Sequence, residues 1–271
     1  MNLSNVGPVV LIGAGKMGLA LARGWIAGGL PPTQLVLVDP SPVPATESFA
    51  RETGVRLVPS AHGVLIAVMV LAVKPQIMSD VLAEVRPMVG GHTLVISIAA
   101  GISMRAIAEG LGTERIIRTM PNTPAQVGKG VTGAVRGPGA TDADRDLADA
   151  LLSAAGQVVW LDAEQQIDVV TAVSGSGPAY VFHFVEALAA AAMRQGLDPE
   201  RAMQLARQTV IGAAALMEAD PAPAATLRQN VTSPKGTTEA ALGVLMGPGG
   251  LSGLMDKTVM AAKARSEELG R

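Results

Sequence analysis

VVLIGAGKMG, residues 9–18, is the stretch of sequence that decides the fold. Its four apolar residues predict a buried strand, and the spacing of Gly13, Gly15 and Gly18 fits the pattern G-x-G-x-x-G at the start of a helix. In this pattern the glycines allow a tight turn, a close approach of the backbone to a pyrophosphate, and close packing of the helix on the strand. The N-terminus of the helix turns free N–H groups toward the phosphates. The stretch therefore predicts a dinucleotide-binding unit and a nicotinamide-dependent oxidoreductase.

An acidic residue stands where this interpretation requires one. Asp39 ends the next apolar run, QLVLVD at residues 34–39, about 20 residues after the glycines. A carboxylate at this position accepts hydrogen bonds from the adenosine ribose. Its negative charge repels the 2′-phosphate of NADPH, so Asp39 taken alone favours NADH. Two interpretations of Lys16 stay open, namely contact with a phosphate or an exposed side chain that points to solvent.

The sequence up to residue 162 alternates short apolar runs with helical patterns. Strands are predicted at residues 6–12, 34–39, 67–73, 93–98, 115–120, 131–135 and 157–161. Near-continuous runs of Val and Ile are typical of strands buried on both faces of a parallel sheet. Helical segments between them, such as 17–27 and 42–52, imply right-handed crossovers and an α/β, doubly wound sheet. Thr141 followed by Asp144 predicts the start of the last helix of this part.

After Asp162 the apolar runs give way to alanine-rich helical patterns. Helices are predicted at residues 178–195, 199–218, 235–245 and 252–268, and the Asp-Pro pair at 198–199 caps the second of them. Segment 184–193 is apolar nearly all round, which is typical of a buried helix. A small domain buries such a helix more easily under a second subunit, although a helical cap on the chain's own sheet is the alternative. We predict a dinucleotide-binding Rossmann domain over 1–162 and a helical dimerisation domain over 163–271.

Composition excludes several kinds of site. The chain has no cysteine, which excludes disulfides, a thiolate nucleophile and a cysteine-ligated metal. His62, His92 and His183 lack metal-ligand spacing, so no metal site is expected. A net charge of −2 argues against a basic surface that binds nucleic acid and against a polybasic membrane anchor.

The apolar segments of the chain point to a protein without a membrane span. The most apolar window, residues 64–73, is about half the length that crosses a bilayer and is interpreted as a buried strand with its lead-in. The first apolar run leads straight into glycines, which is not the pattern of a signal peptide. A cytoplasmic protein is therefore expected.

Five further motifs follow in order along the chain. They read VKPQ (73–76), SIAAG (97–101), MPNTPA (120–125), SGSGPAY (174–180) and VTSPKGTT (231–238). Together with the glycine-rich turn they resemble the pyrroline-5-carboxylate reductase family, over residues 9 to about 245. The resemblance implies reduction of 1-pyrroline-5-carboxylate to L-proline with NADPH or NADH, the last step of proline biosynthesis. It also implies a Rossmann domain and a helical domain that interlocks as a homodimer, five of which often form a decamer.

The resemblance implies a set of site residues. The cofactor contacts would be Ile12, Gly13, Ala14, Gly15, Lys16, Met17, Asp39, Val73, Lys74, Pro75, Ala100 and Asn230. The substrate contacts would be Glu164, Ser233, Gly236, Thr237 and Thr238. A cyclic imine is already electrophilic, so the site must align it with the nicotinamide and anchor its carboxylate rather than supply a nucleophile. Thr238 is the expected catalytic residue, because its hydroxyl would hydrogen-bond the ring nitrogen.

Some of these residues also have purely structural interpretations. Glu164 is an acid at a predicted helix start, and Thr237 with Thr238 would serve as a helix N-cap pair. The chain also departs from the family pattern at three positions. Asp39 replaces a small polar residue, Ala61 replaces an asparagine, and Lys235 replaces the first glycine of SPGGTT. The first two weaken the case for NADPH, and we expect the Lys235 side chain to point outward.

Two other functions compete with this prediction. One is a reductase of another small imine or carbonyl acid, and the other is a non-catalytic sensor of NAD(P)H built on the same fold. Turnover of 1-pyrroline-5-carboxylate separates all three, because only the first function oxidises the cofactor with that substrate.

Overall fold

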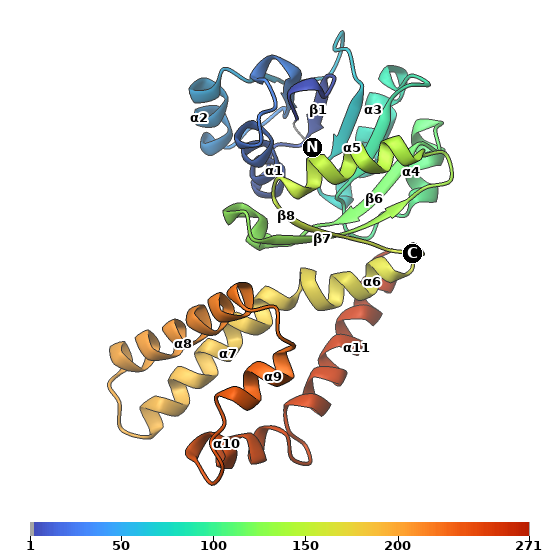
Figure 1. Cartoon of the computed structure of the whole chain (residues 1–271). Helices are drawn as coiled ribbons and strands as arrows, with labels where there is room; N and C mark the ends of the chain where they lie inside the picture. Colours follow the sequence, from blue (N-terminus) through green and yellow to red (C-terminus); the bar gives the residue numbers. More distant parts are fainter. Residues whose placement is uncertain (1–2, 271) are drawn as a thin grey trace. The chain divides into compact units, whose positions relative to one another are not determined.

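The computed structural model describes residues 3–270 and divides the chain into two compact units. One unit contains the residues up to Ser176 together with those from Ala262 onward, and the other is Gly177–Ala261 (Figure 1). The predicted boundary, between a Rossmann domain over 1–162 and a helical substrate-binding and dimerisation domain over 163–271, stays a prediction. No helix within residues 3–270 is long and apolar enough to cross a membrane.

The first unit is built on an eight-stranded sheet with the order β3-β2-β1-β4-β5-β6-β7-β8. The strands are β1 (Val9–Ile12), β2 (Leu35–Val38), β3 (Arg56–Val58), β4 (Val68–Leu71), β5 (Leu94–Ser97), β6 (Ile116–Met120), β7 (Gly130–Arg136) and β8 (Gly156–Trp160). All residues of β1, β2, β4 and β5 are buried, as expected for strands covered on both faces. The predicted α/β, doubly wound sheet is confirmed, and the short edge strand β3 was not predicted.

Helices cover both faces of this sheet (Figure 1). They are α1 (Lys16–Ala27), α2 (Pro44–Thr53), α3 (Met78–Val85), α4 (Met104–Leu111) and α5 (Asp142–Ser153). Alternate residues of each strand point to opposite faces. Val9 and Leu11 join a core with α1 and α5, whereas Val10 and Ile12 join a core with α3 and α4. The aliphatic strands thus hold the carboxyl end of β1 rigidly beside the start of α1.

The direction of the last two strands was not predicted. β7 runs antiparallel to β6, and β8 runs parallel to β7. Only residues 121–129, with a short 3₁₀ helix at Thr123–Val127, connect β6 to β7. A parallel crossover needs a dozen or more residues, so this connection is long enough only for an antiparallel return.

The start of α5 holds a buried ion pair. Thr141 and Asp144 form the predicted capping box, and Arg115 donates two hydrogen bonds to the Asp144 carboxylate at 2.9 and 2.6 Å. The Asp144 side chain is only 2% exposed. The hydrogen bonds from Arg115 lower the pKa of Asp144 to about 2 from its ordinary value of 3.8. The charged carboxylate therefore stabilises the fold.

We expect Asp144→Asn to lower the free energy of unfolding at pH 7 by about 2 kcal/mol. Because the pKa of Asp144 is depressed, its carboxylate contributes stability above pH 3.8, and this contribution disappears as the pH falls toward 2. Between pH 3.8 and 2 the free energy of unfolding should therefore depend less on pH in the Asp144→Asn variant than in wild type. Urea titrations between pH 2 and 7 measure this. Asp142→Asn is the matched control, because Asp142 pairs with Arg136 at the surface of the same helix and its side chain is 91% exposed. Equal effects of the two substitutions would contradict the prediction.

The second unit consists of helices. They are α7 (Gly177–Arg194), α8 (Pro199–Ala219), α9 (Ala224–Asn230), α10 (Thr237–Leu245) and the first part of α11 (Leu251–Leu269), and α9 was not predicted. Asp198 caps α8 through the N–H of Arg201, as the Asp-Pro pair predicted. The small core is built from Ala189, Ala202 and Ala206.

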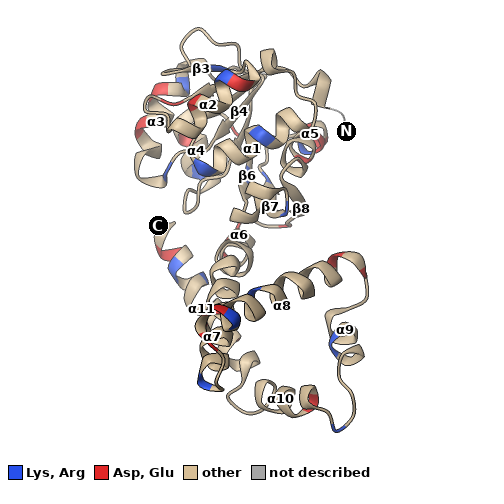
Figure 2. Ribbon diagram, turned by 90° about the vertical axis from the view of Figure 1, so that its left-hand side faces the viewer, with Lys and Arg blue, Asp and Glu red and all other residues tan. Residues whose placement is uncertain are grey.

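Segment 184–193 of α7 was expected to be buried, but Ala189 is its only buried residue. Phe184 is 43% exposed and Met193 is 44% exposed, and on α8 Ile211 is 51% exposed. Figure 2 shows that charged residues are sparse along α7 and α8. Large apolar side chains with this exposure are typical of a surface that another chain covers.

Candidate active site

The turn between β1 and α1 has the predicted geometry, with a different physical reason for each glycine. Gly13 has a φ of +90°, and a Cβ atom there would lie 2.8 Å from Val73 Cγ1. A Cβ atom on Gly18 would lie 2.4 Å from the carbonyl oxygen of Gly13, so the helix approaches the strand only without a side chain. At Gly15 no atom lies within 4 Å of the added Cβ, which leaves open space in front of the backbone. These are the turn, packing and ligand-approach positions of a dinucleotide site.

Asp39 is fixed against this turn. The N–H of Ala14 donates to Asp39 Oδ2 at 3.0 Å, and the N–H of Ser41 donates to Oδ1 at 3.0 Å. Each carboxylate oxygen has a second lone pair, which leaves acceptor capacity for ribose hydroxyls. Because both oxygens are held, the negative charge has a defined position at the carboxyl end of β2.

The other predicted cofactor residues of the first unit gather at the same edge of the sheet. Ile12 ends β1, and Lys16 and Met17 begin α1. Val73, Lys74 and Pro75 follow β4, and Ala100 follows β5. Since β1 lies between β2 and β4, and β5 lies beside β4, these segments are neighbours at the carboxyl ends of parallel strands. Open α/β sheets bind ligands at this edge. Lys16 is exposed there, and both interpretations of its side chain stay open.

Except for Glu164, the remaining predicted residues lie close together in the sequence of the second unit. Asn230 ends α9, the loop of residues 231–236 follows, and Thr237 is the first residue of α10. The N-cap of α10 is Gly236, without a side-chain hydrogen bond, so the interpretation of Thr237 and Thr238 as an N-cap pair is wrong. Within residues 3–270 neither threonine hydroxyl is hydrogen-bonded to another residue. A helix start with open N–H groups and two threonine hydroxyls is suited to an anion and a polar ring atom.

Lys235 occupies an unusual backbone conformation in this loop. Its φ of 58° is the only positive value of a non-glycine residue within the described part of the chain. Its N–H donates to Glu239 Oε2 at 2.7 Å, which ties the loop to the first turn of α10. The left-handed conformation explains a glycine at this position in the family, because a side chain there costs about 1 kcal/mol. The lysine is exposed, and its expected outward direction stays a prediction.

Glu164 lies in the first unit and has protein partners. Its Oε1 accepts hydrogen bonds from Arg118 Nη1 and from the backbone N–H of Met104, both at 2.7 Å. Met104 is the first residue of α4, so Glu164 supports the start of that helix rather than of its own. A contact with substrate would therefore use the second oxygen, Oε2. Arg118 was missed, although a charged residue inside the apolar run RIIRTM signals a buried ion pair.

Two of the other motifs meet in the first unit. Asn122 of MPNTPA donates to the carbonyl oxygen of Ser174 at 3.1 Å and accepts from the N–H of Val131 at 2.9 Å. Ser174 belongs to a π-helical turn, Thr171–Gly175, between α6 (Gln166–Val170) and α7. Turns of this kind are frequent at functional sites. The contact fixes the end of β6 against the turn that precedes α7.

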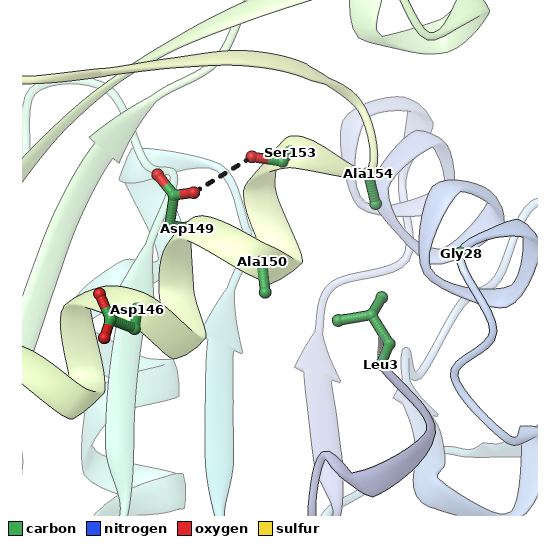
Figure 3. Close-up of a pocket in the computed structure, with 7 residues that line it drawn as sticks. All are labelled: Leu3, Gly28, Asp146, Asp149, Ala150, Ser153 and Ala154. Atoms are coloured by element: carbon green, nitrogen blue, oxygen red, sulfur yellow. Dashed lines mark hydrogen bonds between the residues drawn. The ribbon is translucent and has the colours of Figure 1, made fainter. Parts of the chain in front are cut away.

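The cavity drawn in Figure 3 is a separate feature. It lies between the end of α1 and α5 and is lined by Leu3, Gly28, Asp146, Asp149, Ala150, Ser153 and Ala154. None of the predicted site residues lines it. Asp149 is engaged there by Ser153 and by Trp160 Nε1. The candidate site residues of the first unit lie at the carboxyl edge of the sheet, and those of the second unit lie in the loop before α10 and at its start.

Comparisons with known proteins agree with this geometry. A family model described as pyrroline-5-carboxylate reductase dimerisation matches residues 164–269, and one described as NADP oxidoreductase, coenzyme F420-dependent, matches residues 8–101. A pyrroline-5-carboxylate reductase of Pseudomonas aeruginosa is 41% identical over 264 residues, which cover 96% of each chain.

Solved structures show the same likeness. A pyrroline-5-carboxylate reductase from Coxiella burnetii is 38% identical with a TM-score of 0.92, covering 98% of this chain and all of the other. A Plasmodium falciparum pyrroline carboxylate reductase with NADP bound is 28% identical with a TM-score of 0.81, covering 98% of this chain and 99% of the other. The likeness thus extends through both units.

Proposed function

The chain belongs to the pyrroline-5-carboxylate reductase family, and we propose which of its residues bind the dinucleotide and which bind the substrate. The enzyme is an oxidoreductase that reduces 1-pyrroline-5-carboxylate to L-proline with NAD(P)H, in the last step of proline biosynthesis. The observation that carries the assignment of the site is the open space before Gly15 beside the fixed carboxylate of Asp39.

The first unit holds the dinucleotide. The N–H groups at the start of α1 receive the pyrophosphate, since Gly15 leaves the backbone there open to it. Asp39 accepts the ribose hydroxyls, and the residues after β4 and β5 extend the site toward the nicotinamide end. When bound, the reduced nicotinamide supplies the hydride. Asn230 is the proposed contact from the second unit.

The loop before α10 anchors the substrate. The proposed anchor for the carboxylate is the loop of Ser233 and Gly236 together with the backbone N–H groups of Thr237 and Thr238, which have no intrahelical acceptors in the first turn of α10. The Thr238 hydroxyl donates a hydrogen bond to the ring nitrogen, which gains a proton as the imine carbon gains a hydride. Thr237 and Glu164 complete the proposed contacts. The remaining task of the site is alignment of the two reacting atoms.

We propose that the enzyme is a homodimer through its helical unit. The support is the match to a dimerisation family model over residues 164–269, together with the exposed apolar side chains of α7 and α8. A decamer of five dimers is the larger assembly that the family resemblance suggests. Light scattering of the purified protein separates monomer, dimer and decamer by mass.

A cytoplasmic location is also part of the proposal. Fractionation of cells that produce the protein tests it.

The central experiment follows absorbance at 340 nm with 1-pyrroline-5-carboxylate and either dinucleotide. We expect oxidation of the cofactor and formation of L-proline in equal amounts. Tight binding of the dinucleotide without turnover would favour the sensor. Turnover only with a different imine or carbonyl acid would favour the related reductase.

Asp39 is expected to set the cofactor preference. Wild type should have the higher kcat/KM with NADH, and Asp39→Ser should shift the NADPH-to-NADH ratio of kcat/KM upward by about tenfold or more, because it removes a charge that faces the 2′-phosphate. Steady-state kinetics with both dinucleotides measure the ratio. Asp39→Asn is the matched control for size, and it should shift the ratio in the same direction. A strong preference of wild type for NADPH would show that this role of Asp39 is wrong.

A further inference from the structure

The middle residue of the glycine turn is held at both of its backbone polar groups. The N–H of Ala14 donates to Asp39 Oδ2 at 3.0 Å, and the carbonyl oxygen of Ala14 accepts from Thr46 Oγ1 at 2.7 Å. Ala14 and Thr46 are both fully buried. Thr46 lies in the first turn of α2, so three separate segments of chain meet at this one residue.

This arrangement fixes a part of the backbone that would otherwise be mobile. Ala14 lies between Gly13 and Gly15, and glycines give the backbone its largest conformational freedom. The direction of the N–H groups after Ala14 depends on the orientation of its peptide units. Fixing both sides of the residue sets that direction before a ligand arrives, which removes an ordering cost from binding.

Resting on the proposed function, we propose that Thr46 is a positioning residue for the phosphates of the dinucleotide. It acts through Ala14 and holds the turn in the conformation that the pyrophosphate requires. Asp39 holds the other side of Ala14, but it also carries the charge that faces the ribose. The two residues are therefore distinguishable, because Thr46 acts on a part of the ligand that NADH and NADPH share.

The test replaces the hydroxyl of Thr46 and leaves its shape. Thr46→Val should raise the Kd of NADH and of NADPH by the same factor, about three- to tenfold, as expected for one lost hydrogen bond in a buried site. The ratio of the two dissociation constants and kcat at saturating cofactor should stay unchanged. Thr46→Ser keeps the hydroxyl, so the dissociation constants of NADH and NADPH should both stay at their wild-type values. Thr46→Ala gives the same comparison if the valine variant does not fold.

A second buried threonine provides the matched control. Thr93 Oγ1 donates to the carbonyl oxygen of Ile66 at 3.1 Å, and Thr93 is 2% exposed. It precedes β5, at the amino edge of the sheet and away from the cofactor edge. Thr93→Val should lower Tm without a change in either Kd.

The results of these measurements distinguish failure of the role of Thr46 from failure of the proposed function. If Thr46→Val lowers Tm as Thr93→Val does but binds both dinucleotides as tightly as wild type, the role of Thr46 is only structural and the inference is overturned. A change in the ratio of the two dissociation constants would also overturn it. If wild type binds neither dinucleotide, the proposed function fails instead.

Discussion

We expect Thr238→Ala to lower kcat/KM for 1-pyrroline-5-carboxylate by one to three orders of magnitude, the range of a lost general-acid hydrogen bond. The ring nitrogen gains a proton during the reaction, and the hydroxyl of Thr238 is the group proposed to stabilise that change. In the structure this hydroxyl has no hydrogen bond to another of residues 3–270, so its removal should leave the fold intact. Steady-state kinetics at saturating NADH or NADPH measure the effect.

The controls for this prediction separate chemistry from folding and from cofactor binding. Thr238→Ser keeps the hydroxyl and should retain most of the activity. The Tm and the Kd of the dinucleotide should match wild type in both variants, because the lost contact is to the substrate. An alanine variant with wild-type kcat/KM would remove Thr238 from the mechanism.

Gly18→Ala is expected to disrupt the dinucleotide site by displacing the backbone around it. Its Cβ atom would lie 2.4 Å from the carbonyl oxygen of Gly13 and 3.2 Å from Leu11 Cδ2, so either α1 or the turn must move. We expect a loss of about 1–3 kcal/mol in the free energy of unfolding, as for an overpacked core. The movement also misplaces the N–H groups of the turn, so the Kd of both dinucleotides should rise by at least tenfold. Thermal unfolding and fluorescence titration measure the two effects.

Gly15→Ala is the matched variant, and its expected result is different. The added methyl group meets no atom within 4 Å, and Gly15 has a φ of −69°, which alanine adopts without strain. Gly15 is the N-cap of α1, where alanine is less favourable than glycine, so stability should fall only slightly and by much less than in Gly18→Ala. Dinucleotide affinity should still fall, because the methyl group occupies the space through which the pyrophosphate approaches the backbone. Wild-type affinity in this variant would mean that the pyrophosphate binds elsewhere.

Much of the fold could be predicted because local sequence patterns fix it. The aliphatic runs of β1, β2, β4 and β5 are buried on both faces, so each carries a continuous signal. The start of α5 is specified by the capping box of Thr141 and Asp144. The edge strand β3 was missed because a strand of three partly exposed residues, Arg56–Val58, carries little periodicity.

The hydrogen-bond partners in the site could not be predicted, since they come from segments that are distant in sequence. Glu164 was expected at the start of its own helix, and it contacts Arg118 and the start of α4 instead. The role of Thr46 could not be predicted from the sequence, because a threonine in the first turn of a helix is common in any protein. Its importance depends on the contact with Ala14.

The sequence by itself determined the class of cofactor, the α/β architecture and the family, because glycine spacing, aliphatic runs and short motifs are local properties of the chain. The tertiary structure alone decided the antiparallel direction of β7, the N-cap of α10 at Gly236, and the hold of Asp39 and Thr46 on Ala14. Each of these depends on which distant groups come within hydrogen-bonding distance, and that follows only when the sheet has formed and its helices have packed against it.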